Sequence, residues 1–157
     1  MDYSIATDIF QAYPGYRRGI MVVSGAVNTG NGAAIEALLR AEEEAVRQRL
    51  GSGNVAEHPT VAAWRDAYRR FGAKPSEHRS SIEAMLRRVV KPDRLPSINL
   101  LVDIGNIVSL RHLLPAGVHP LPASGDSALE LRRARSSDSF APAGDDHAKT
   151  PVLRDHR

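Results

Sequence analysis

The sequence predicts a single α+β domain in which three or more helices pack on a small β-sheet. Apolar residues recur at helical spacing in several segments, and one run of β-branched residues is typical of a buried strand. The 157 residues are 42% hydrophobic and 25% charged, which suits one globular domain with a core. We expect this domain to span residues 1–143 and a polar, disordered tail to span residues 144–157.

The N-terminal part predicts a short entry element and then a strand. A turn signal at residues 13–16 (YPGY) follows a short helix or extended segment. Residues 19–27 (GIMVVSGAV) are the best strand candidate, because a continuous β-branched run is typical of burial on both faces. The glycine-containing loop after it has neither a Gly-Lys-Ser/Thr end nor G-x-G-x-x-G spacing, so we interpret it as a plain connection.

Residues 33–50 predict an amphipathic helix that ends at the Gly-Ser-Gly-Asn sequence after Leu50. Its glutamates at positions 42–44 are expected to face solvent. Its apolar side is expected to consist of Ile35, Leu38, Leu39, Ala45, Val46 and Leu50.

Residues 58–81 predict a second helix and a turn that together carry a basic surface. The helix has an apolar stripe and ends at Gly72. Its other faces and the following turn bring several cations near the start of the next helix, which suits a phosphate or carboxylate. The alternative is that each arginine only solvates a surface helix. The stripe is Val61, Trp64, Tyr68 and Phe71, and the cations are Arg65, Arg69, Arg70, Lys74 and Arg79.

The charge is unevenly distributed along the chain. Nine Lys or Arg but only four Asp or Glu lie between His58 and Arg94, whereas the whole chain has a net charge of +3. This asymmetry favours an anionic partner such as nucleic acid, although basic surfaces also serve solubility.

Two further helices and a strand complete the prediction. Ser80 and Glu83 have capping-box spacing before the first of these helices. Pro96 is placed to open the last helix, residues 97–113, and residues 128–134 alternate as a strand.

The last helix has a polar line on an otherwise apolar surface. Asn99, Asp103 and Asn106 lie at i, i+4 and i+7. Buried polar groups need partners, so the line either anchors neighbouring loops or faces a ligand in a cleft.

Several classes of site are excluded or unsupported. The chain has no cysteine, and no second His at metal spacing accompanies His112, so we expect no metal and no cofactor. No run approaches the roughly 18 apolar residues of a membrane span, and the N-terminus has no signal-peptide pattern. We expect a cytoplasmic protein without membrane association.

Two long strings carry a family resemblance. HPTVAAWRDAYRRFGAKPSEHRSSIEAMLRRV and LPSINLLVDIGNIVSLRHLLPAG resemble the stand-alone B3/B4 tRNA-binding domain proteins, which are similar to the editing domain of the phenylalanyl-tRNA synthetase beta subunit. Phe10, the Pro-Gly at residues 14–15 and VVSGAVN resemble the start of the same domain. The resemblance covers about residues 5–143, and the polar line falls on the family's INLLVDIGNIVSL motif.

The resemblance implies a tRNA-binding protein that hydrolyses the ester of mischarged tRNA in trans. The alternatives are a non-catalytic tRNA-binding or small-ligand-binding module and an inactive fragment. Bound groups that position water and stabilise an oxyanion suffice for this chemistry. Asn99, Asp103 and Asn106 are the expected catalytic residues, and the aminoacylated tRNA is expected to contact Arg65, Arg69, Lys74, Ser76, Arg79, Ser80, Ser81 and Arg111.

The sequence departs from this family in two places. His119 and two prolines stand in AGVHPLPASGD, where stand-alone relatives have an acidic residue, so no role is transferred to His119. Relatives continue past the Thr-Pro at residues 150–151 with further strands. We therefore expect a C-terminally truncated sheet with an open edge.

Overall fold

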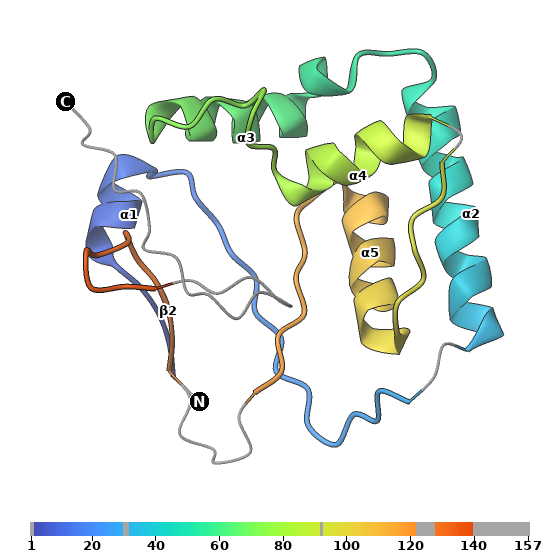
Figure 1. The fold of residues 1–157 in the computed structure, drawn as a ribbon, viewed down its shortest axis with the longest axis horizontal. Coiled ribbons are helices and arrows are strands. Elements are labelled where there is room, and N and C mark those ends of the chain that lie inside the picture. The colour runs from blue at the N-terminus through green and yellow to red at the C-terminus, as the bar shows by residue number, and fades with distance from the viewer. Residues whose placement is uncertain (1, 30–31, 92, 122–127, 140–157) are drawn as a thin grey trace. The chain divides into compact units, whose positions relative to one another are not determined.

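The computed structural model describes residues 2–29, 32–91, 93–121 and 128–139. In these residues the chain forms five α-helices, a short 3-10 helix and a two-stranded sheet, which confirms the α+β class (Figure 1). The chain divides into two compact units, Met1–Met21 with Pro120–Arg157 and Val22–His119. The tail predicted at residues 144–157 and the truncated sheet predicted beyond residue 151 lie outside the described residues.

The first unit contains a parallel pair of strands. β1 (Asp2–Ile5) pairs with β2 (Ala128–Leu131), and α1 (Thr7–Ala12) follows β1 directly. The backbone N–H of Ala6 extends the ladder by donating to Leu131 O at 2.9 Å. The second strand is thus shorter than the predicted residues 128–134.

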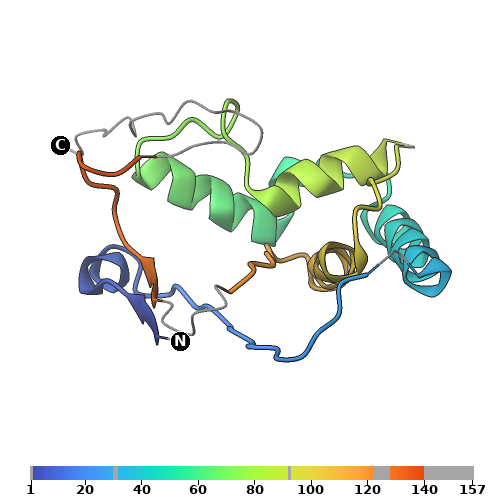
Figure 2. The same cartoon turned by 60° about the horizontal axis from the view of Figure 1, so that its bottom comes forward.

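The second unit is a helical assembly. It contains α2 (Ala33–Leu50), η1 (Val55–Glu57), α3 (Pro59–Arg70), α4 (Ser81–Val90) and α5 (Leu100–His112). Figure 2 shows α2 and α5 side by side, and α4 contacts both. The core between these helices is formed by fully buried aliphatic side chains, whose removal from water drives the association of the helices. These side chains include Leu39, Val46, Val61, Ile82, Leu86, Val89 and Leu110.

The helix ends are set by local backbone chemistry. α2 ends at Gly51, whose φ of 52° is easily adopted by glycine. α5 begins at Leu100 rather than near residue 97, so the prediction that Pro96 opens it is wrong. The reason is that the Asn99 side chain caps the helix by accepting the Val102 N–H at 3.0 Å.

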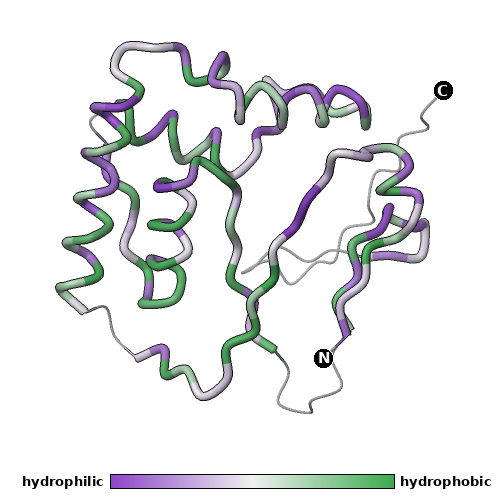
Figure 3. The backbone as a smooth tube through the Cα atoms, turned by 180° about the vertical axis from the view of Figure 1, so that it is seen from behind, coloured by the Kyte–Doolittle hydropathy of each residue, from purple (hydrophilic) through white to green (hydrophobic). Residues whose placement is uncertain are grey.

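The predicted strand at residues 19–27 is also wrong. The segment is irregular and its apolar side chains are exposed, with Met21 at 85% and Val27 at 68%. Figure 3 shows it as a largely hydrophobic stretch outside any helix. A β-branched run becomes a strand only when a neighbour pairs with its backbone, and the sheet of the described residues contains β1 and β2 alone.

The prediction that the α2 glutamates at positions 42–44 face solvent is wrong for Glu43. Its side chain is 1% exposed and pairs with Arg40 at 2.7 Å. It also accepts the backbone N–H of Leu95 at 2.7 Å. A buried carboxylate is tolerated when it is paired in this way, and this one joins α2 to the segment before α5.

Candidate nucleic-acid interface

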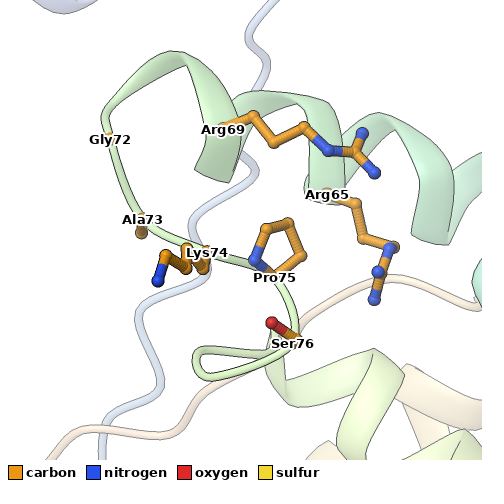
Figure 4. Close-up of a pocket in the computed structure, with 7 residues that line it drawn as sticks. All are labelled: Arg65, Arg69, Gly72, Ala73, Lys74, Pro75 and Ser76. Carbon is orange, nitrogen blue, oxygen red and sulfur yellow. The ribbon is translucent and has the colours of Figure 1, made fainter.

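An open pocket of about 420 Å³ lies between α3 and the loop that follows it. Four of the predicted RNA-contacting residues line it, so the structure brings these four together. Its lining consists of Arg65, Arg69, Gly72, Ala73, Lys74, Pro75 and Ser76 (Figure 4).

The cations of this pocket point in two directions. Arg65 and Arg69 are one helical turn apart on α3, and Figure 4 shows both guanidinium groups on the same side of the Pro75 ring. The Lys74 amine points away from them. The two arginines therefore form a cationic side of the pocket, and guanidinium groups are well suited to binding phosphate.

Two of these cations have exposed acidic partners. Arg69 pairs with Asp66, and both side chains are more than half exposed. Lys74 lies 3.2 Å from Glu77 with the lysine 73% exposed. Exposed ion pairs contribute little to stability and rearrange easily, so both cations remain able to bind a phosphate.

Arg65 has a different, buried partner. Its NH1 donates to Glu83 Oε1 at 2.7 Å, and the Glu83 side chain is 1% exposed. The sequence pattern predicts for Glu83 only a place in a capping box. One half of that box exists, because Ser80 Oγ accepts the Glu83 N–H at 3.4 Å. The carboxylate instead turns to Arg65, 18 residues away, a contact that no local pattern signals.

The remaining predicted RNA-contacting residues do not line this pocket. Arg79 makes a long contact of 3.5 Å to the Ser76 carbonyl, and Ser81 is the exposed first residue of α4. Ser80 is 5% exposed and occupied as the helix cap. Arg111 pairs with Glu42 on α2, where it ties α5 to α2.

The polar line of α5 consists of three residues in different states. Asp103 is fully buried and accepts hydrogen bonds from Ser97 Oγ at 2.6 Å and the Ile98 N–H at 3.0 Å. The Asn99 oxygen is used in the helix cap. Asn106 is half-buried, and no side-chain hydrogen bond of Asn106 is found among the residues that the structure describes.

Asp103 thus anchors the chain that leads into α5. Because its carboxylate is enclosed, a substrate could reach it only if the segment with Ser97 and Ile98 moved. Asn106 is the member of the line whose donors and acceptor remain available to a ligand.

Two other kinds of feature are absent from the described ranges. No three His, Asp or Glu side chains there gather in a way that could hold a metal ion. None of the helices in those ranges is both long and apolar enough to cross a membrane.

Comparison with protein families identifies the chain. A family model for the B3/4 domain matches residues 63–157. The chain belongs to the B3/4 domain family. B3/4 domains are associated with tRNA binding and editing by the beta subunit of phenylalanyl-tRNA synthetase. Comparison with curated proteins found no match, and comparison with solved structures found none either.

The matched part of this B3/4 domain includes every predicted site residue, from Arg65 to Arg111. It begins within α3, so β1, α1 and α2 precede it. The pocket and the polar line of α5 therefore both lie in the matched part of the chain.

Proposed function

We propose that this B3/4 domain binds tRNA through the α3 face, defined as Arg65 and Arg69 with the pocket loop at residues 72–76. The observation that carries the proposal is that the guanidinium groups of Arg65 and Arg69 lie on the same side of an open pocket. Guanidinium groups bind phosphate oxygens in bidentate geometry, and phosphate contacts supply most of the affinity for nucleic acid. The uneven charge between His58 and Arg94 supports the same partner.

The test is the salt-dependent binding of fluorescently labelled tRNA, measured by anisotropy. Replacing Arg69 by Ala should weaken binding several-fold and reduce the slope of log K against log[salt] by roughly 0.7–1. The matched control is Arg17→Ala, an exposed arginine that donates to the carbonyls of Pro14 and Tyr16. Equal affinity of the wild type and a folded Arg65→Ala/Arg69→Ala variant would overturn the proposal.

A second candidate function is deacylation of mischarged tRNA in trans, which the half-buried Asn106 amide favours. An amide that is held on a rigid helix and has no internal partner can orient an aminoacyl group or a water molecule. Asp103 then acts by holding the start of α5, and the Asn99 NH₂ group remains able to donate.

Release of labelled amino acid from mischarged tRNA tests this activity. The Asn106→Ala variant should lose release while it keeps the tRNA affinity of the wild type. No release by the wild-type protein, with tRNA binding retained, would leave the non-catalytic binding module as the function. We further propose that the protein acts in the cytoplasm, and that residues 1–143 form the B3/4-like domain and residues 144–157 a tail.

A further inference from the structure

We propose that Glu83 is a positioning residue for tRNA binding, which it strengthens although it is itself an anion. The inference rests on the proposed tRNA-binding function. Glu83 lies on α4, and its side chain is buried behind the α3 face. Its Oε1 accepts Arg65 NH1 at 2.7 Å and Arg87 Nε at 2.9 Å.

Glu83 and its two arginine partners together keep a net positive charge. One carboxylate lies between two guanidinium groups, Arg65 and Arg87, whose side chains are 19% and 39% exposed. The anion is therefore compensated without cancelling the charge of the face. By contrast, the exposed pair of Arg69 with Asp66 and the exposed pair of Lys74 with Glu77 each join one cation to one anion and so carry no net charge.

The contact also fixes the direction of Arg65. An arginine side chain has many rotamers, and a phosphate that immobilises it must compensate for the lost entropy. Here Glu83 holds the guanidinium by one nitrogen, and the remaining donors have no partner in the described part of the chain. A guanidinium has five donors, so four stay available on the pocket side or to water.

Glu83 and Glu77 should consequently act in opposite directions. Glu77 is exposed, and it competes with phosphate for the exposed Lys74. Removing Glu77 should raise the positive potential and tighten binding. Removing the Glu83 charge also makes the α3 face more positive, but it frees the Arg65 side chain from the orientation that Glu83 fixes. The loss of this fixed orientation should outweigh the gain in positive charge.

The experiment measures tRNA affinity and salt slope for Glu83→Gln and for the control Glu77→Gln. Glutamine keeps the side-chain size and one oxygen acceptor. We expect Glu83→Gln to weaken binding three- to tenfold and Glu77→Gln to leave it unchanged or tighten it. If Glu83 acts through Arg65, Glu83→Gln should have no further effect in an Arg65→Ala background.

Three outcomes would overturn the role of Glu83. The first is unchanged or tighter tRNA binding by Glu83→Gln. The second is a loss of affinity on Glu83→Gln that is equally large in the Arg65→Ala background. The third is a loss of affinity that thermal unfolding explains by unfolded Glu83→Gln protein, while a folded Glu83→Asp variant binds tRNA like the wild type. If Arg65→Ala and Arg69→Ala weaken binding but Glu83→Gln does not, only this inference fails. If neither arginine matters, the tRNA-binding function itself fails.

Discussion

Asp103 and Ser97 form a 2.6 Å hydrogen bond that ties the first turn of α5 to the segment preceding it. The same carboxylate accepts the Ile98 N–H at 3.0 Å, and it is fully buried. This arrangement makes Asp103 a structural residue in the described fold.

Replacing Asp103 by Ala should lower the free energy of unfolding by about 2–3 kcal/mol, because Ser97 Oγ and the Ile98 N–H both lose the acceptor that the fully buried carboxylate supplies. Ser97→Ala should cost about 1 kcal/mol. Urea unfolding followed by circular dichroism measures both. Asn106→Ala is the control, and its change should stay within about 0.5 kcal/mol. A stable Asp103→Ala variant would contradict the anchoring role.

The Asn99 cap should be separable from any role of Asn99 in substrate binding. Its side chain accepts the Val102 N–H at 3.0 Å, so Asn99→Ala should lower stability by about 1 kcal/mol. Asn99→Asp keeps an acceptor at a helix start and should retain the stability. Thermal unfolding of the two variants tests this. Equal destabilisation by the Ala and Asp variants would show that the lost stability does not come from the helix cap.

The exposed segment at residues 19–27 should tolerate polar substitution. Met21 is 85% exposed and Val22 57% exposed, so Met21→Ser with Val22→Thr should change the free energy of unfolding by less than about 0.5 kcal/mol. Leu86→Ala, in the core, should cost about 2–5 kcal/mol. Denaturant titration compares the two. A similar loss in both variants would mean that the segment is buried in a sheet.

The pair of Arg132 and Asp138 should be visible in a pH titration. The Arg132 guanidinium, helped by the Arg135 backbone N–H, lowers the pKa of Asp138 well below its usual range. Because the folded-state pKa is depressed, the pair stabilises the fold above the unfolded pKa of about 3.9, and this contribution is lost as pH falls through the folded value.

Carboxyl NMR measures that pKa directly. In the Arg132→Ala variant the Asp138 midpoint should rise toward about 3.9. Arg133→Ala removes the neighbouring pair with Asp8 and should leave the Asp138 midpoint where it is. Identical midpoints in wild type and Arg132→Ala would show that the pair does not form in solution.

Local patterns predicted the helices well. The helix predicted at residues 33–50 has those bounds, because a 3.6-residue apolar period and a following glycine are properties of a short stretch of chain. The Ser80 cap before α4 was predicted for the same reason. The pocket was partly predictable too, since Arg65 and Arg69 are one turn apart on a single helix.

By itself the sequence determined the helical segments, the α+β class and the concentration of cations between His58 and Arg94. Only the tertiary structure decided which polar groups are enclosed. Glu43 is held partly by Leu95 and Glu83 by Arg65, and these partners are far away in the sequence. The strand predicted at residues 19–27 does not form for the same physical reason. Strand pairing and charge burial both depend on what a distant part of the chain supplies, and no local period encodes it.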